Sequence, residues 1–496
     1  MKKLILLLFV LVSCTSTPIT EAIKEQRPNI LFIEVDDLTA KYLGCFGADF
    51  AKTPMIDRLA EKGVVFNNAV VQAAMCTPSR NSLITSLYPH NLGQYHNLDI
   101  KSLPKDIWTF PKALQKEGYH TIWVGKNHLL PDCKGIEAEN YIEYVNKGMQ
   151  TEMGFDDVYQ SMGRSVNFIN ANKQFKENGC WEEGIDAYGD FLYQNNLMKT
   201  FLSEEFNQPT TLDPDTEFMD GHFITTAIDK LKNYKEKDPF FLWVNLSGPH
   251  FPYNAPRNYQ RRFNKKNMPK IIDSDVETNE IPEKLKSHTY NKSDTYTAIM
   301  RKKYSANVTY MDDQVKRIVT YLKTTKYRDN TMIVFFSDHG IMLGDHGLVG
   351  KETLFKEVLN PALIIWFPNK FKTKRISTPV ELLDLGKTVL DIAGASDTIL
   401  NETPNGNSLL PLLTEEGEFA GNGIVYSEIK DFTSVFNGDY KYIHNTETSI
   451  LFNLKDNPDE TNNVIEDEPE MTTHLKNEMD KWLLKSGGQI KGVVEY

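Results

Sequence analysis

The sequence predicts an α/β protein with a large mixed, mostly parallel sheet flanked by helices and a smaller C-terminal α+β domain. Short apolar runs rich in β-branched and aromatic residues indicate buried strands. Helical patterns separate these runs, as expected when parallel strands are joined by crossover helices. After about residue 396, closely spaced strand-like pieces and one helix replace that alternation. A chain of 496 residues is long enough for one large domain and one small domain.

The expected strands of the large sheet span residues 29–35, 121–124, 240–246 and 331–337, and turn-forming residues bound each of them. Helical patterns lie at 54–62, 107–117 and 225–234. In the smaller domain we expect strand pieces at 423–429, 434–444 and 449–454, with a hairpin turn at Asn437-Gly438, and then a helix at 468–484. The large domain therefore covers 28–395, and the smaller domain covers 396–496.

The first 27 residues differ from the rest of the chain. Lys2 and Lys3 precede an apolar run at 4–12, which is too short to span a bilayer and is typical of a signal peptide. The run ends at Ser13-Cys14, which resembles the cleavage box of bacterial lipoproteins; an ordinary signal peptide with an incidental cysteine is the alternative. We expect a signal peptide at 1–13, a tether at 14–27, and an exported protein anchored to a membrane through lipidated Cys14, in the periplasm or at the cell surface.

Composition limits the class of protein. The chain is 40% hydrophobic and 25% charged, which indicates an ordinary soluble body, and its net charge of −12 argues against a nucleic-acid partner. Apart from Cys14, its cysteines are too few and too scattered for a disulfide framework or a Cys-based zinc site: Cys45, Cys76, Cys133 and Cys180.

Polar side chains that could take part in catalysis or ligand binding follow each expected strand of the large sheet. They are Asp36 and Asp37, then Lys126 and His128, then His250, and finally Asp338 and His339. The carboxyl ends of parallel strands share one edge of a sheet, where α/β proteins bind their ligands. We therefore expect these residues to meet in one crevice, although they are more than 300 positions apart in the chain.

Three carboxylates in that crevice favour a bound divalent cation. Asp36, Asp37 and Asp338 would repel one another, so that either one of them takes a proton or a metal ion neutralises them. Oxygen ligands favour Ca²⁺ or Mg²⁺ over Zn²⁺, although His339 is a softer ligand than either ion prefers. The structural alternative is that Asp36 or Asp37 caps the following helix.

Cys76 precedes a helix expected at 79–87, so its side chain would lie at a helix N-terminus, where backbone N–H groups favour an anion. From these residues alone, Cys76 is either a thiolate nucleophile or a buried small hydrophobic residue.

A family resemblance bears on this choice. The run Cys76-Thr77-Pro78-Ser79-Arg80 resembles the Cys-x-Pro-Ser-Arg signature of the formylglycine-dependent sulfatases of the alkaline phosphatase superfamily. The similarity extends from about Pro28 to the C-terminus. Further matching pieces are Pro28-Asn29-Ile30-Leu31 before Asp36-Asp37, Gly125-Lys126, Gly248-Pro249-His250, Ser337-Asp338-His339-Gly340 and Gly344-Asp345-His346-Gly347. His339, at a position that is often Asn in sulfatases, resembles the iduronate-2-sulfatase-like branch.

The resemblance implies an alkaline phosphatase-like fold and a sulfuric ester hydrolase. A maturation enzyme would oxidise Cys76 to formylglycine, whose hydrate has two hydroxyls: one attacks sulfur, and the other then loses its proton so that sulfate is expelled. Ca²⁺ rather than Mg²⁺ would bind to Asp36, Asp37, Asp338, His339 and the modified Cys76. The other implied catalytic residues are Arg80, Lys126 and Lys351, which would balance negative charge, His128, which would contact the hydrate, and His250, which would protonate the leaving oxygen.

Family and export together predict a sulfated polysaccharide or its oligosaccharides as the substrate, and hence a role in polysaccharide degradation. The alternatives are a phosphonate or phosphodiester hydrolase of the same superfamily and a glycan-binding lipoprotein without catalysis.

Two further features stay open. Residues 257–270 are basic and could attract a polyanionic chain or form a solvated loop. The insertion at 132–220 contains Trp181, Tyr188 and Tyr193, which could stack on sugars or pack the insertion itself.

Overall fold

The computed structural model describes residues 27–488, apart from 130–146, 204–208, 273–293 and a few positions within 98–105, 179–185 and 446–447. The expected signal peptide and the residues Cys14, Cys133 and Cys180 lie outside the described residues. No described helix is long and apolar enough to cross a membrane.

The main sheet has eight strands in the order β11-β2-β10-β7-β1-β6-β4-β5. Five neighbouring strands, from β7 to β5, are parallel, whereas β10 is antiparallel to both of its neighbours. The strand bounds are β1 (Asn29–Asp36), β2 (Val64–Phe66), β4 (His120–Lys126), β5 (Asp157–Ser161), β6 (Phe240–Pro249), β7 (Thr331–Ser337), β10 (Leu363–Trp366) and β11 (Lys374–Ile376). The predicted mixed, mostly parallel sheet is confirmed.

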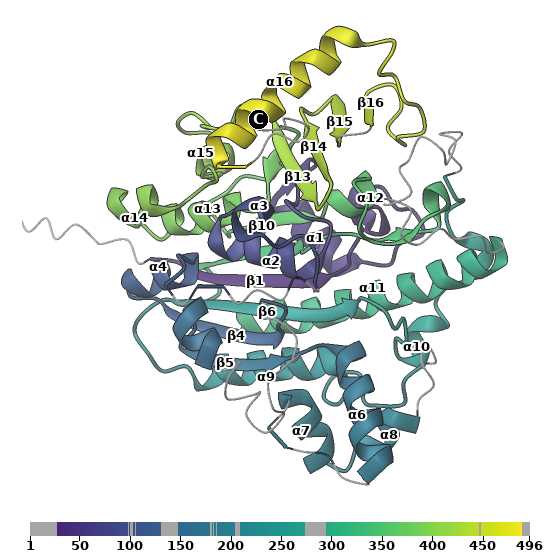
Figure 1. Cartoon of the computed structure of the whole chain (residues 1–496). Coiled ribbons are helices and arrows are strands. Elements are labelled where there is room, and N and C mark those ends of the chain that lie inside the picture. The colour runs from purple at the N-terminus through teal and green to yellow at the C-terminus, as the bar shows by residue number, and fades with distance from the viewer. Residues whose placement is uncertain are drawn as a thin grey trace, which may run out of the picture.

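Helices cover both faces of this sheet (Figure 1). On one face lie α9 (Met219–Asn233) and α11 (Asp294–Lys323), and on the other lie α2 (Cys76–Thr85), α4 (Phe110–Lys116) and α13 (Asp384–Ile392). Every residue of β1 is buried. Phe32 in its middle contacts the rings of Phe110, Phe241, Trp243 and Phe336, so the strand is held at the centre of an aromatic core.

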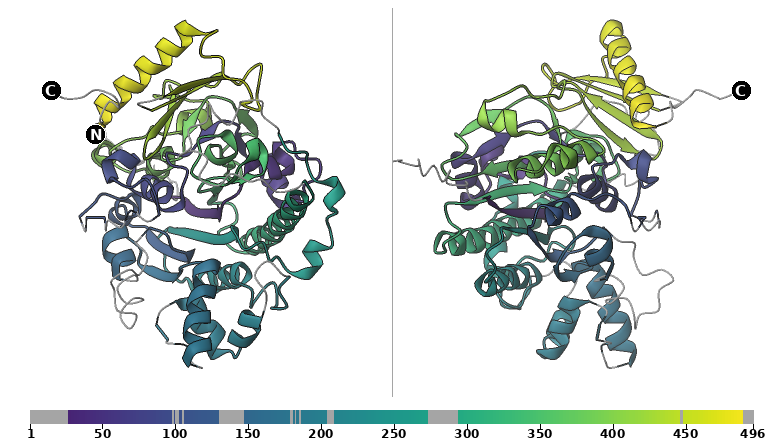
Figure 2. Two further views of the ribbon diagram at one scale, coloured as in Figure 1. Left: turned by 45° about the vertical axis from the view of Figure 1, so that its right-hand side comes forward. Right: turned by 90° about the vertical axis from the view of Figure 1, so that its left-hand side faces the viewer.

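A second, antiparallel sheet is formed by β13 (Val425–Ile429), β14 (Phe432–Phe436), β15 (Tyr440–His444) and β16 (Ser449–Asn453), and α16 (Pro469–Ser486) packs on it. This small α+β unit lies on the side of the main sheet opposite to the helices α6 (Arg164–Asn178), α7 (Ala187–Gln194) and α8 (Met198–Ser203), as Figures 1 and 2 show. The hairpin turn predicted at Asn437-Gly438 joins β14 to β15.

The remaining elements are short, apart from α1. They are β3 (Ala69–Val70), β8 (Met342–Leu343), β9 (Val349–Gly350), β12 (Val380–Glu381), α1 (Pro54–Lys62), α3 (Pro89–Leu92), α10 (Arg257–Gln260), α12 (Lys356–Leu359), α14 (Asp397–Glu402) and α15 (Leu410–Thr414).

The predicted strands correspond to β1, β4, β6 and β7, and the helix at 54–62 is α1, but three other helices begin elsewhere than predicted. Helix α4 begins at Phe110 rather than 107, because the hydroxyl of Thr109 caps it. Helix α9 begins six residues earlier than predicted, at Met219. Its first turn contains Gly221, where a Cβ atom would lie 2.0 Å from the carbonyl oxygen of Pro214, so only glycine fits there. Helix α2 begins at Cys76 rather than 79.

Candidate active site

The carboxyl ends of four strands gather the predicted residues at one edge of the main sheet. Strands β4, β6, β1 and β7 are adjacent and parallel, so their carboxyl ends share that edge. Asp36 ends β1, Lys126 ends β4 and His250 follows β6, while Asp338 and His339 follow β7. The structure thus brings together side chains from segments far apart in the sequence, as expected.

Cys76 is the first residue of α2, and it is fully buried. Met75 precedes it in an extended conformation, and its carbonyl accepts the first helical hydrogen bond, from Ser79 N–H at 3.0 Å. The N–H of Thr77 lies in the first turn and therefore has no acceptor within the helix. It donates to the side-chain oxygen of Asn97 at 2.9 Å. The helix therefore fixes the position of Cys76 at its N-terminus.

The thiol of Cys76 lies among charged groups. Its Sγ is 2.8 Å from Lys351 Nζ, 3.2 Å from His339 Nε2 and 3.5 Å from Asp36 Oδ1. A cysteine that only fills space is usually surrounded by apolar side chains. These contacts favour a chemical role for Cys76 over the packing role that the sequence left open.

Four buried residues offer ligand atoms that all lie within 4.8 Å of one another: Asp36, Asp37, Cys76 and His339. The carboxylate oxygens fit a divalent cation that prefers oxygen, and His339 adds a softer nitrogen ligand. Asp338 lies beside this group, but its Oδ2 accepts a hydrogen bond from Arg80, and its Oδ1 accepts the N–H groups of Asp37 and His339. Asp338 therefore orients Arg80 and fixes the backbone at Asp37 and at His339.

Asp37 has a left-handed backbone conformation, with φ of 62°. Such a conformation costs a residue other than glycine free energy, and it persists where the surrounding contacts enforce it. Here the N–H of Asp37 donates to Asp338 at 3.1 Å, and its carbonyl accepts the hydroxyl of Tyr304 at 2.6 Å. The carboxylate is thereby turned toward Lys351, whose Nζ is 2.9 Å from its Oδ1.

Arg80 is buried one helical turn after Cys76. Its Nε donates to Asp338 at 2.9 Å, and its Nη1 donates to Asn245 Oδ1 at 2.9 Å and lies 3.1 Å from Glu34 Oε1. The other oxygen of Glu34 accepts Trp243 Nε1–H at 2.7 Å. Burial raises the pKa of Glu34 to about 8, although the Arg80 charge opposes this shift. These partners hold the guanidinium in one orientation.

Two lysines place positive charge next to the aspartates. Lys126 contacts Asp36 directly, and Lys351 contacts both Asp37 and the thiol of Cys76. Burial alone would raise the pKa of Asp36, but the positive charges of Lys126, His250, Arg80 and Lys351 together outweigh it and hold that pKa well below its usual value. Both aspartates are therefore anionic at neutral pH.

Two of the three predicted histidines, His128 and His250, have lowered pKa values, and burial is the largest cause for both. For His128, the charge of Lys126 adds to the effect of burial, so the ring is neutral at neutral pH. His250 lies with Nε2 3.7 Å from Asp37 Oδ2 and with Nδ1 2.6 Å from the carbonyl of Phe251. A neutral imidazole can accept a proton, and the imidazolium that forms can then donate it.

Glu34, Asn245 and Asn97 also contribute to the site but were not predicted from the sequence. An acidic residue inside the apolar run of β1 was a signal for Glu34, because a charge in a buried strand needs a partner. No local pattern marks Asn245 or Asn97, since their roles depend on contacts with Arg80 and Thr77 from other elements.

In the insertion, Trp181 and Tyr188 are buried, whereas Tyr193 is 37% exposed. The first two therefore pack the insertion itself, which decides between the two interpretations for them. Cys45 is half-buried and has no disulfide partner among the described residues.

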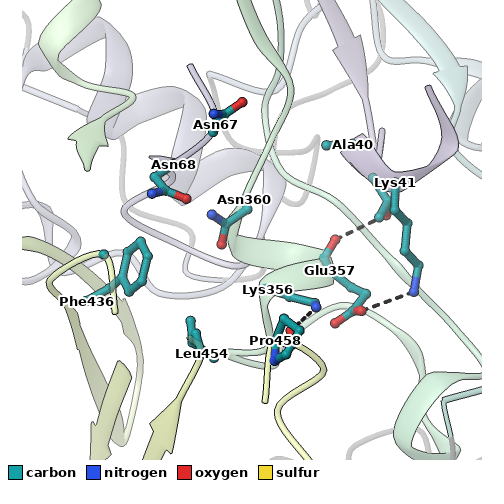
Figure 3. A pocket seen from close by; sticks show the side chains of 12 residues that line it. Ala40, Lys41, Asn67, Asn68, Lys356, Glu357, Asn360, Phe436, Leu454 and Pro458 are labelled. Carbon is teal, nitrogen blue, oxygen red and sulfur yellow. Dashed lines mark hydrogen bonds and ion pairs between the residues drawn. The ribbon is translucent and has the colours of Figure 1, made fainter. Parts of the chain in front are cut away.

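A cavity of about 280 Å³ lies between the main sheet and the C-terminal sheet (Figure 3). Lys41, Asn360, Glu357 and Phe436 are among its lining residues, and none of the strand-end residues lines it. Lys41 is paired with Glu357 at 3.1 Å, as Figure 3 shows. This cavity is separate from the candidate active site.

Residues 28–395 match the model of the family described as Sulfatase, and residues 344–486 match the model described as N-sulphoglucosamine sulphohydrolase, C-terminal. The N-acetylglucosamine-6-O-sulfatase of Bacteroides thetaiotaomicron is 26% identical over 497 residues, which cover 88% of this chain and 83% of that protein. The iduronate 2-sulfatase of Mus musculus is 29% identical over 361 residues, which cover 69% of this chain and 60% of that protein. Among solved structures, the phosphonate monoester hydrolase of Agrobacterium radiobacter superposes with a TM-score of 0.76 at 20% identity, covering 93% of this chain and 96% of that chain.

Proposed function

The chain belongs to the sulfatase family of the alkaline phosphatase superfamily, and from this we propose that it releases sulfate from a sulfated carbohydrate through an oxidised Cys76. The family predicted from the cysteine signature is confirmed, and so is the assignment as a sulfatase enzyme. One observation carries the proposed mechanism: the Cys76 thiol is buried at the start of α2, within 3.5 Å of Lys351, His339 and Asp36.

Oxidation of Cys76 to formylglycine would supply a hydrated aldehyde, of which one hydroxyl displaces the alcohol from sulfur and the other, on losing its proton, lets sulfate leave. A maturation enzyme must carry out this oxidation. A thiol has no second hydroxyl, so the unmodified chain cannot complete this cycle.

Cations beside Cys76 would hold the sulfate group. Lys351 lies 2.8 Å from the thiol, Lys126 contacts Asp36, and Arg80 donates to Asp338. The negative charge of three sulfate oxygens is stabilised best by donors that are fixed before the reaction, and the partners of Arg80 fix it in this way. These three residues therefore bind and orient the ester.

His250, once it has taken up a proton next to Asp37, would donate that proton to the oxygen of the leaving alcohol, and His128 would hold the hydroxyl that loses a proton. A sugar alkoxide is a poor leaving group, so proton donation in the transition state accelerates its departure. Ca²⁺ held by Asp36, Asp37, Asp338, His339 and the modified Cys76 would supply further positive charge at the reacting group.

The substrate class is supported by the named activity of the Bacteroides relative, an N-acetylglucosamine-6-O-sulfatase. We propose a sulfated polysaccharide or an oligosaccharide derived from it. The expected export and lipid anchor on Cys14 would place the enzyme where such polymers are met. Replacement of Cys14 by Ala, followed by membrane fractionation, tests the anchor: a variant that stays in the membrane fraction would rule it out.

The decisive experiment is co-expression with a formylglycine-generating enzyme, for the wild type and Cys76→Ala. Mass spectrometry of the peptide that carries residue 76 reports the oxidation, and sulfate release from a panel of defined sulfated oligosaccharides reports the activity. We expect release by the oxidised wild type alone, with Cys76→Ala folded but inactive. Turnover by Cys76→Ala would refute the nucleophile assignment.

A second candidate activity is phosphonate monoester hydrolysis, because the similarity to the Agrobacterium hydrolase covers almost the whole chain. Matched aryl sulfate and aryl phosphonate monoesters distinguish the two activities. A strong preference for the phosphonate would replace the sulfatase proposal for the physiological reaction.

A further inference from the structure

Residues 257–270, which we name the basic segment, concentrate positive charge in an acidic protein. The segment has no carboxylate and six cationic side chains: Arg257, Arg261, Arg262, Lys265, Lys266 and Lys270. The whole chain has 55 Lys and Arg residues against 67 Asp and Glu residues. The basic segment therefore reverses the sign of the charge found over the molecule as a whole.

All six cations of the basic segment are exposed. Arg262 lies 3.6 Å from Asp313, and it is the one member of the six that forms an ion pair with any residue that the structure describes. Five positive charges within 14 consecutive residues thus face solvent without a carboxylate partner in the described part of the chain, and like charges repel one another. An anionic ligand with several charges would relieve that repulsion.

The backbone of the basic segment is fixed although its charged side chains are exposed. Tyr259 and Phe263 are buried, and Lys52 Nζ donates to the carbonyl of Arg262 at 2.7 Å. Near its end, the guanidinium of Arg301 donates to the carbonyls of Pro269 and Lys270 at 2.8 Å and 2.9 Å. Binding to a surface that is already ordered loses less conformational entropy than binding to a mobile loop.

Both ends of the basic segment join loops of the candidate active site. Arg257 begins the segment seven residues after His250, so the two lie within about 25 Å of each other by chain length. At the other end, Ile272 N–H donates to Asp345 Oδ1 at 2.8 Å, six residues before Lys351. Figure 1 shows α10, which starts the segment, on the side of the sheet toward which β6 points.

We propose that the basic segment binds a part of a sulfated polysaccharide next to the sugar whose ester reacts at Cys76. This inference rests on the proposed function and names a second contact surface for the same polymer. A chain with an anionic group on successive sugars can place one sulfate in the active site and others against the segment. A small sulfate ester reaches only the active site.

The test neutralises three cations that form no ion pair with any described residue, in the variant Arg257→Gln, Lys265→Gln, Lys266→Gln. The matched control is Lys232→Gln, Lys235→Gln, Lys237→Gln. Its three lysines are also exposed, but they precede β6 and therefore lie at the opposite edge of the sheet. Both variants change the net charge by the same amount.

Binding is measured with dextran sulfate at an ionic strength of about 0.1 M, where charges on different parts of the surface are screened from one another. We expect the segment variant to bind about tenfold more weakly, with a smaller dependence of affinity on salt, because fewer counterions are released. We expect the control to bind like the wild type. The wild type, the segment variant and the control should hydrolyse an aryl sulfate at the same rate.

Unchanged dextran sulfate binding by the segment variant, or an equal loss in the control, would overturn the proposal. Weaker binding to vesicles of anionic phospholipid together with unchanged dextran sulfate binding would assign the segment to a membrane surface instead. If the oxidised wild type hydrolyses no aryl sulfate but the segment variant still loses dextran sulfate binding, the proposed function fails while the polysaccharide surface stands.

Discussion

Replacing Arg80 by Met tests whether the buried charges beneath Cys76 form one unit. Met has a similar length but no charge and no hydrogen-bond donors. The change leaves Asp338 without its cation, removes the guanidinium 3.1 Å from Glu34 Oε1, and takes away the donor 2.9 Å from Asn245 Oδ1. Because all of these side chains are buried, water cannot replace the guanidinium.

The magnitude follows from this burial. Removing one partner from a buried ion pair costs about 3–5 kcal/mol. Unfolding entropy is about 2.1 cal/mol/K per residue, so a chain of 496 residues loses on the order of 1 °C in melting temperature per kcal/mol. We therefore expect the melting temperature to fall by about 3–5 °C. Loss of one fixed donor to the sulfate group should also lower kcat by about 100- to 1000-fold.

Differential scanning calorimetry and sulfate release from an aryl ester measure the two effects on the oxidised protein. Arg80→Lys is the control: it keeps the charge but not the planar fork that contacts several partners, so it should lose less stability than Arg80→Met. A melting temperature for Arg80→Met within about 1 °C of the wild type, with kcat reduced less than about threefold, would refute both the electrostatic unit and the role in binding sulfate.

Other perturbations test the metal, the acid and the pH dependence. Ca²⁺ added to chelator-treated protein at about 100 times its Kd should stabilise the fold by about 2.7 kcal/mol, and calorimetry should show little such effect in Asp37→Asn; equal stabilisation of the variant would exclude Asp37 as a ligand. His250→Ala should slow release from a sugar sulfate by about 100-fold but from an aryl sulfate by much less, since an aryl oxide leaves without a proton; equal losses in steady-state assays would contradict the role as acid. Burial raises the pKa of Glu381 to about 8 and that of Asp384 to about 7, with each carboxyl retaining a proton that the unfolded chain releases near pH 4. The stability that these protons provide is fully present below about pH 4 and is lost as the pH rises to about 8. Gln cannot lose a proton in this range, so the melting temperature of Glu381→Gln relative to the wild type should increase from pH 5 to pH 8. A difference that stays constant with pH would argue against the raised pKa of Glu381.

Local patterns in the sequence determined the elements that carry the site. Strands β1, β4, β6 and β7 are apolar runs with polar residues at their ends, and parallel strands place those ends at one edge. The placement of Asp36, Lys126 and His250 near one another was therefore predictable without coordinates. The oxidation of Cys76 was inferred from the family signature alone, because no physical property of the run Cys-Thr-Pro-Ser-Arg specifies it.

Only the tertiary structure decided how the site is supported. Glu34 and Asn245 contact Arg80 across sequence separations of 46 and 165 residues, and such contacts leave no local pattern. The same holds for Asp338, whose carboxylate accepts a hydrogen bond from Arg80. The basic segment, in contrast, has a positive charge that can be read directly from the sequence. Its attachment to the active-site loops depends on hydrogen bonds such as that from Ile272 to Asp345, which form only once distant elements have packed together. Periodicity and charge are local properties of a chain, whereas the partner of a buried polar group is set by the packing of the whole molecule.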